Sequence, residues 1–218
     1  MLNQIVDAYH RTALLEREAI FPDTKLMPIS RPEDAAIAAP GWVGKQWQPS
    51  GTLLMAINPG GGGDAYRPNP TDERLYGLFR AFRAAPADQR EVALLALSEG
   101  WAAIQKTHNI YRLIRPIMEA LDAGSEDLTF LNVLPFRTRQ DKPAGSAVLR
   151  RAWDVATAQQ VTALQPRRII ALGRKAFDAL TAVGATKEYD VVYLKRAIGD
   201  SHVTPEAQAA IAALRDIR

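Results

Sequence analysis

The chain has 218 residues, of which 47% are hydrophobic and 23% are charged, and its formal net charge is +3. This length suits one domain with a substantial core, and the composition is ordinary for a globular protein. The sequence contains no cysteine, which excludes disulfides, thiolate catalysis and cysteine-held zinc or iron–sulfur centres. No apolar run approaches the roughly 20 residues of a membrane span. We therefore expect a single domain covering residues 1–218 that is cytoplasmic, monomeric and without membrane contact.

Residues 1–49 are predicted to form an N-terminal helix followed by an irregular arm that packs on the rest of the domain. Residues 2–20 space their apolar side chains for one face of a helix, and His10 is expected on its polar surface. The arm carries prolines at positions 22, 28, 32, 40 and 49, which interrupt regular structure. It also carries Trp42 and Trp47, whose exposure would be costly. The arm is therefore expected to pack across the domain, with stacking of a tryptophan on a base as the alternative.

Four short apolar segments alternate with helical patterns through the rest of the chain. These strand signatures are residues 52–57, 128–135, 169–173 and 190–194. Strands separated by helices at this spacing predict a parallel sheet with helices on both faces. We therefore expect an α/β fold, namely a three-layer α/β/α sandwich around a central, mostly parallel, four-stranded sheet. Right-handed crossovers would bring the four strand ends to one rim.

Asn58 and the glycines after it mark the first strand end as a candidate binding site. Asn58-Pro59 stops the strand, because proline removes a backbone donor and confines the preceding residue to extended geometry. Glycines follow at positions 60–63, and they allow a ligand to approach the main chain closely. A polar side chain at the carboxyl end of a buried strand lies where open α/β sheets bind ligands. A flexible turn is the alternative for the glycine run by itself.

The positions of other polar residues also bear on where a binding site could lie. Asn132 lies inside the second strand, where a buried amide needs hydrogen-bond partners that a ligand can supply. His108 and Asn109 stand at the junction of two predicted helices and are expected to cap or turn the chain. The three histidines are far apart and fit no metal-ligand spacing, so no metal and no cofactor are expected.

Basic residues gather at the predicted rim, which is compatible with a polyanionic partner. Arg174 and Lys175 occupy the first turn of a predicted helix, where the macrodipole disfavours cations unless a phosphate is bound. Screened, solvated charges are the alternative for these two residues. We assign phosphate binding to Arg137, Arg174, Lys175 and Arg196.

Three segments together resemble the uracil-DNA glycosylase superfamily, closest to its mismatch-specific uracil/thymine DNA glycosylase branch. Ala56-Ile-Asn-Pro-Gly resembles the first motif of the family, and the following Tyr66 echoes the aromatic residue of that branch. Residues 130–136 are similar to the second strand, and residues 169–176 to the third strand and its helix.

The resemblance implies hydrolysis of the N-glycosidic bond of uracil, or of a related damaged base, flipped out of single- or double-stranded DNA. By that analogy Asn58 orients the attacking water, Tyr66 walls the base and Asn132 reads its polar edge. Gly60 and Gly61 would contact the substrate along its backbone phosphates.

The last family motif is altered in this chain. Where the family places His-Pro-Ser or Asn-Pro-Ser, residues 197–205 contain His202 without a following proline. We assign His202 the role of donor to the charge that develops on the departing base, and Asp64 is a candidate base near the glycines. The alternative function is a non-catalytic or diverged nucleotide- or nucleic-acid-binding domain on the same fold. A third hypothesis is an unrelated enzyme that holds a phosphorylated small molecule on the glycine loop.

Overall fold

The computed structural model describes residues 2–21, 37–60, 70–138, 144–196 and 203–216. Its centre is a five-stranded sheet in the order β1-β3-β2-β4-β5. The parallel part of this sheet consists of β2 (Thr52–Ala56), β3 (Thr129–Asn132), β4 (Arg168–Leu172) and β5 (Asp190–Leu194). The predicted α/β fold with a mostly parallel sheet is therefore confirmed.

The fifth strand corrects the predicted count of four. β1 (Trp42–Val43) pairs antiparallel with β3, and it comes from the arm that was predicted to be irregular. The Trp42 ring stacks on Phe130 with 6.2 Å between ring centroids, and its Nε1 donates to Oε1 of Gln105 at 2.9 Å. On the outer edge, the Val43 amide donates to Oγ of Ser98 at 3.1 Å. A two-residue strand carries no periodic signal, so these long-range contacts determine it.

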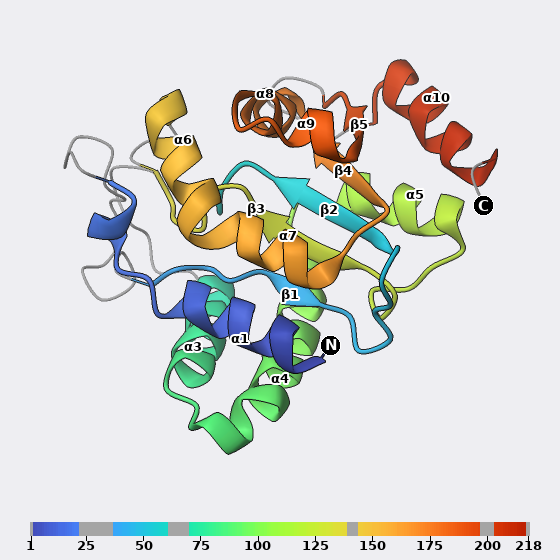
Figure 1. The fold of residues 1–218 in the computed structure, drawn as a ribbon. Coiled ribbons are helices and arrows are strands. Elements are labelled where there is room, and N and C mark those ends of the chain that lie inside the picture. Colours follow the sequence, from blue (N-terminus) through green and yellow to red (C-terminus); the bar gives the residue numbers. More distant parts are fainter. Residues whose placement is uncertain (1, 22–36, 61–69, 139–143, 197–202, 217–218) are drawn as a thin grey trace.

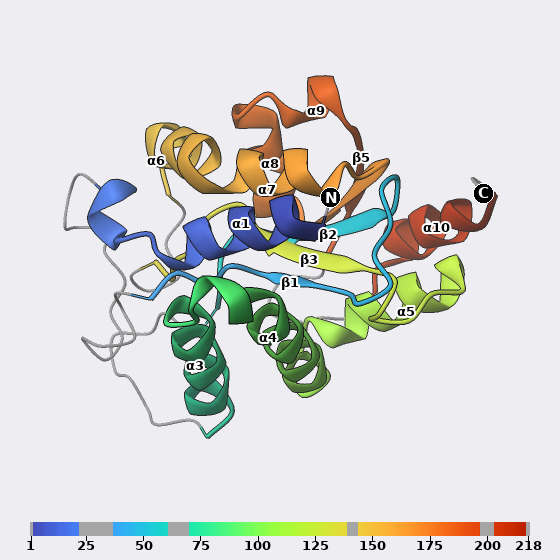
Figure 2. The ribbon, with the colours of Figure 1, turned by 60° about the horizontal axis from the view of Figure 1, so that its bottom comes forward.

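Helices cover both faces of the sheet (Figures 1 and 2). One face carries α6 (Ser146–Ala152), α7 (Ala158–Leu164), α8 (Arg174–Ala182) and α9 (Ala185–Glu188). The other carries α3 (Pro70–Arg83), α4 (Arg90–Gln105) and α5 (Tyr111–Leu121), with α10 (Pro205–Ala213) beside α5 and β5. α1 (Leu2–Ala13) lies at the β1 edge against α7 and α4.

The connections between strands create a crevice at one end of the sheet. α3, α4 and α5 connect β2 to β3 on one face, whereas α6 and α7 connect β3 to β4 on the opposite face. The chain therefore leaves β2 and its neighbour β4 toward opposite faces. In open α/β sheets, ligands bind in the crevice at such a switch point, outside the carboxyl ends of the strands.

Most residues of the apolar segments predicted as strands β2, β3 and β4 are buried in the core. Leu53, Leu54 and Met55 of β2 are fully buried, as expected of a central strand covered on both faces. Between α6 and α7, residues Trp153–Thr157 form a π-helical turn. Among the described residues, no helix has the length and apolarity needed to cross a membrane.

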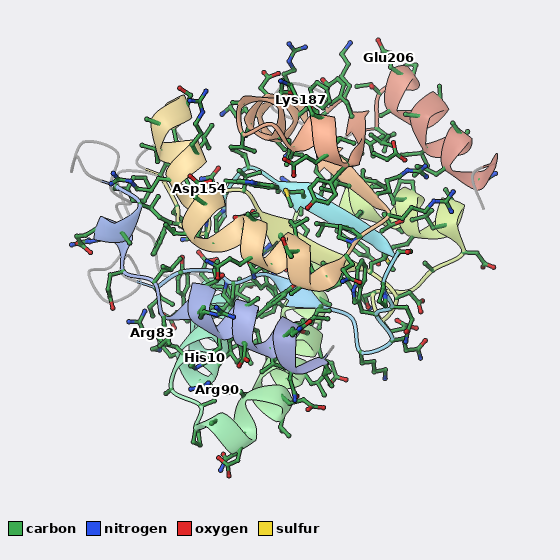
Figure 3. All side chains as sticks on the ribbon, viewed as in Figure 1. His10, Arg83, Arg90, Asp154, Lys187 and Glu206 are labelled. Atoms are coloured by element: carbon green, nitrogen blue, oxygen red, sulfur yellow. The ribbon has the colours of Figure 1, made fainter. Side chains whose placement is uncertain are left out.

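His10 was predicted to be polar surface, and this is wrong. It is 4% exposed, lies edge-on to Phe82 at 5.5 Å between ring centroids, and has Nε2 3.3 Å from the carbonyl oxygen of Arg83. Figure 3 shows it where α1 meets the helices of the second face, near Arg83 and Arg90. Burial lowers the pKa of His10, and Arg90 lowers it further. The neutral ring therefore belongs to the packing between α1 and α3.

Candidate functional site

One cavity of about 550 Å³ opens at the carboxyl ends of the parallel strands. Residues 56–60 at the end of β2 line it, together with Asn132 of β3, Leu172 of β4 and Arg196 after β5. The remaining wall comes from α3, from the end of α4 and from the connection between α4 and α5. The cavity therefore occupies the crevice that the strand order creates.

Asn58 presents one end of its amide to this cavity. Its Nδ2 donates to the carbonyl oxygen of Pro59 at 3.2 Å and to Oγ1 of Thr138 at 3.4 Å. Thr138 is 1% exposed, so its hydroxyl is a fixed partner. Within the described part of the chain, both side-chain hydrogen bonds of Asn58 use Nδ2. Among the described residues no hydrogen bond uses Oδ1, so this acceptor is available to a water molecule or a ligand.

Asn132 contributes a buried donor without a partner. It is the last residue of β3, pairs with Ala56 across the ladder, and is 4% exposed. Its Nδ2 is buried and has no hydrogen-bond partner among the described residues. Such a group costs about 1–3 kcal/mol of stability. Asn132 lines the cavity, so rotation of its amide would bring this donor to a ligand that carries an acceptor.

Flat apolar side chains complete the walls. Trp101 and Phe130 line the cavity and lie 5.9 Å apart at an interplanar angle of 64°. Gln105 lines it as well, while its Oε1 is held by the indole of Trp42. Aromatic walls with amides at the polar end suit a planar heterocycle.

An ion pair crosses one side of the cavity. Arg137 is 6% exposed, and its guanidinium lies 3.0 Å from the carboxylate of Asp72 and 5.2 Å above the centre of the Tyr76 ring. Arg137 was predicted to bind phosphate, but its charge is compensated inside the protein. Asp72, in the first turn of α3, contributes to the cavity as well.

The other three residues predicted to bind phosphate differ in whether they line the cavity. Arg196 lines the cavity. Arg174 lies in the exposed first turn of α8, where its Nε donates to the Asp178 carboxylate at 2.8 and 3.0 Å. Neither Arg174 nor Lys175 is among the described residues that line the cavity. These two residues therefore sit beside the site, while Arg196 is part of it.

The structure brings together five of the residues predicted for the site. They line one cavity although they come from three separate segments, and they are Asn58, Gly60, Asn132, Arg137 and Arg196. Four other predicted residues lie outside the described residues, namely Gly61, Asp64, Tyr66 and His202.

Sequence reasoning missed several residues of the cavity wall. His108 and Asn109 were assigned to capping, yet both line the cavity. Trp101 and Gln105 lie in the last two turns of α4, and nothing local distinguishes them from other core positions. The available signal was the polar run Thr107-His108-Asn109 between two apolar helices, since loops that follow rigid elements often carry binding residues.

No acidic or histidine cluster suited to a metal ion occurs within the described ranges. No protein-family model matches the sequence, and no curated protein matches it. The function therefore has to be argued from the geometry of the cavity.

Proposed function

We propose that this protein is a DNA glycosylase of the uracil-DNA glycosylase type, built as a three-layer α/β/α sandwich. It would hydrolyse the N-glycosidic bond of uracil, or of a related damaged base, after the base has left the DNA stack. The observation that carries this proposal is that Asn58 and Asn132 line one cavity, and that the buried amide nitrogen of Asn132 has no partner in the part of the chain that the structure describes. A carbonyl oxygen of a flipped base is the kind of acceptor that this donor requires.

The remaining features support a neutral, planar ligand at the inner end of the cavity. Trp101 and Phe130 provide apolar walls, and Arg137 is compensated by Asp72, so a bound anion is not needed to balance its charge. Arg196 lies on the same cavity, where a phosphate of the DNA backbone could pair with it. This division of polar and charged groups fits a base inside and a backbone outside.

In the reaction, the oxygen of a water molecule bonds to the sugar carbon C1′ while the bond from that carbon to the base nitrogen breaks. Asn58 Oδ1 accepts a hydrogen bond from the attacking water and orients it. The water proton is lost to solvent, because an amide is too weak a base to hold it. The electron pair of the broken bond leaves with the base. Asn132 stabilises the negative charge on the departing base, so positioning and electrostatics would carry the reaction.

The direct test uses an end-labelled single strand with one uracil, and the same strand with cytosine in its place. Wild-type protein should convert the uracil strand into an alkali-labile product. Asn58→Ala and Asn132→Ala should each lower the rate by about 100-fold, the usual cost of losing one positioning or charge-stabilising contact. Asn3→Ala is the matched control, because Asn3 is exposed on α1, far from the cavity.

Equal background cleavage by wild type and Asn58→Ala would end the catalytic proposal. The alternative of a binding domain without catalysis predicts a different pattern. The uracil strand would then bind and stay intact, and Asn132→Ala would weaken its binding by about tenfold, the value of one lost hydrogen bond.

A further inference from the structure

The short connection between α4 and α5 holds His108 in a fixed position at the cavity wall. The Thr107 amide donates to the carbonyl of Ile104 at 2.9 Å, and its Oγ1 donates to the same carbonyl at 2.7 Å. The His108 amide donates to the carbonyl of Gln105 at 3.0 Å, and the His108 carbonyl accepts from the Tyr111 amide at 2.9 Å. This turn is therefore stiff, and the position of the ring does not depend on a loose loop.

His108 lines the same cavity as Asn58 and Asn132. The charged groups around it come from separate elements: Asp72 from α3, Arg137 after β3, and Arg196 after β5 on the same cavity. Within the described residues, no hydrogen bond of the protein occupies either ring nitrogen. The ring thus offers hydrogen-bonding capacity to whatever fills the cavity.

We propose that His108 contacts the flipped base and hydrogen-bonds its polar edge through the neutral ring. This inference rests on the proposed function and adds a ligand-contacting residue from an element that sequence reasoning assigned to capping. A neutral imidazole has one donor and one acceptor, so it can pair with a base edge that carries both kinds of group. A protonated ring has donors alone and adds a cation beside Arg137.

The electrostatic surroundings favour the neutral ring. Burial lowers the pKa of His108 from its ordinary value of 6.5, Asp72 raises it in part, and Arg137 lowers it again. The ring is therefore neutral at pH 7. Because acid protonates it below its lowered pKa, kcat/KM should be constant above about pH 6.5 and should fall below it, since kcat/KM reports the ionisations of the free enzyme.

The kinetic test compares two variants over a range from about pH 5 to about pH 8. His108→Gln keeps a donor and an acceptor but does not titrate, so it should retain most of the activity at pH 7.5 and lose the acid limb. His108→Leu should lose about tenfold or more in kcat/KM at pH 7.5, as expected for one lost hydrogen bond, and should also lack the acid limb. Wild-type activity and an unchanged acid limb in His108→Leu would overturn the proposal.

A second readout does not need cleavage. The chain has three histidines, so the ring signals can be assigned by NMR with His10→Gln and His202→Gln as references. The probe is a short single strand with one deoxyuridine, bound to Asn58→Ala protein to keep it intact. Binding should lower the pKa of His108 further, because the bound base favours the neutral ring, and the strand with cytosine should not.

The outcomes separate the two proposals. If wild type shows no cleavage that depends on Asn58 but the bound uracil strand shifts the His108 titration, the glycosylase proposal fails and the contact stands. If cleavage depends on Asn58 but the bound strand leaves the His108 titration unchanged, the contact is overturned and the glycosylase stands. Failure of the strand to bind overturns both.

Discussion

Asn132 combines a structural cost with a position suited to a ligand. Its Nδ2 is buried without a partner among the described residues, in a strand whose neighbouring side chains, Phe130 and Leu131, are apolar. An aliphatic side chain of similar size would avoid the desolvation cost of that donor. Polar groups that destabilise the folded protein are typical of binding and catalytic sites, where stability is exchanged for function.

The substitution Asn132→Leu measures both the stability that the buried amide costs and the activity that depends on it. Because leucine has the same branched shape and no polar atoms, we expect the free energy of unfolding to rise by about 1–3 kcal/mol while uracil excision is lost. Urea denaturation gives the first value, and an unchanged m-value would show that the same surface is exposed. Asn132→Ala is the control, since it leaves a cavity and should not stabilise. Destabilisation by Asn132→Leu would show that the amide has a structural partner.

At the scale of elements, the π-helical turn explains how Asn132 is held. Thr157 ends this turn and is fully buried. Its Oγ1 donates to the carbonyl of Val133 at 2.9 Å and approaches the carbonyl of Asn132 at 3.5 Å. Such turns widen a helix locally and are frequent near functional sites. Here the turn brings a hydroxyl to the end of β3, so Thr157 is a positioning residue.

Thr157→Val tests that role. Valine has the same shape without the donor, so the Val133 carbonyl loses its partner and the protein should lose about 1–3 kcal/mol of stability. Misplacement of Asn132 should also lower kcat by about tenfold or more with little change in KM, because small displacements at a site slow the chemical step. Thr157→Ser keeps the hydroxyl and should restore kcat. A Val variant that is less stable but has normal kcat would reduce Thr157 to a purely structural residue.

For the whole molecule, the site depends on all the parallel strands ending at one rim. Arg196 lies on that rim, whereas Lys45 follows the antiparallel β1 and lies near the start of β3, at the opposite end of the sheet. The two cations therefore differ in location although both are exposed. A polyanion that binds at the rim should contact Arg196 but not Lys45.

The salt dependence of binding gives the measurement. Each phosphate neutralised by the protein contributes a slope of about −0.7 to the logarithm of the affinity for single strands against the logarithm of salt concentration. Arg196→Gln should therefore reduce the steepness by about 0.7, and Lys45→Gln should leave it unchanged. A similar loss in Arg174→Gln would indicate that the strand also passes the start of α8. Equal slopes for wild type and Arg196→Gln would contradict a phosphate contact at this residue.

Much of the fold follows from local pattern. The apolar runs at β2, β3 and β4 have no alternation, so burial on both faces and a parallel sheet could be predicted from them. Thr204 and Pro205 predict the start of α10, and the Thr204 hydroxyl does accept from the Ala207 amide at 3.2 Å. β1 could not be predicted, because two residues pair through contacts with β3 and α4 that are far away in the sequence.

By itself, the sequence determined the order of the four parallel strands and marked Asn58 at the end of one strand and Asn132 inside another, because apolar period and proline or glycine breaks are local properties. Tertiary structure alone decided which strands are neighbours, that Asn58 and Asn132 share a cavity, and that Arg137 is neutralised by Asp72. It also placed His108 in the wall of that cavity. These features depend on contacts between residues tens of positions apart, whose energies exist only after the chain has packed.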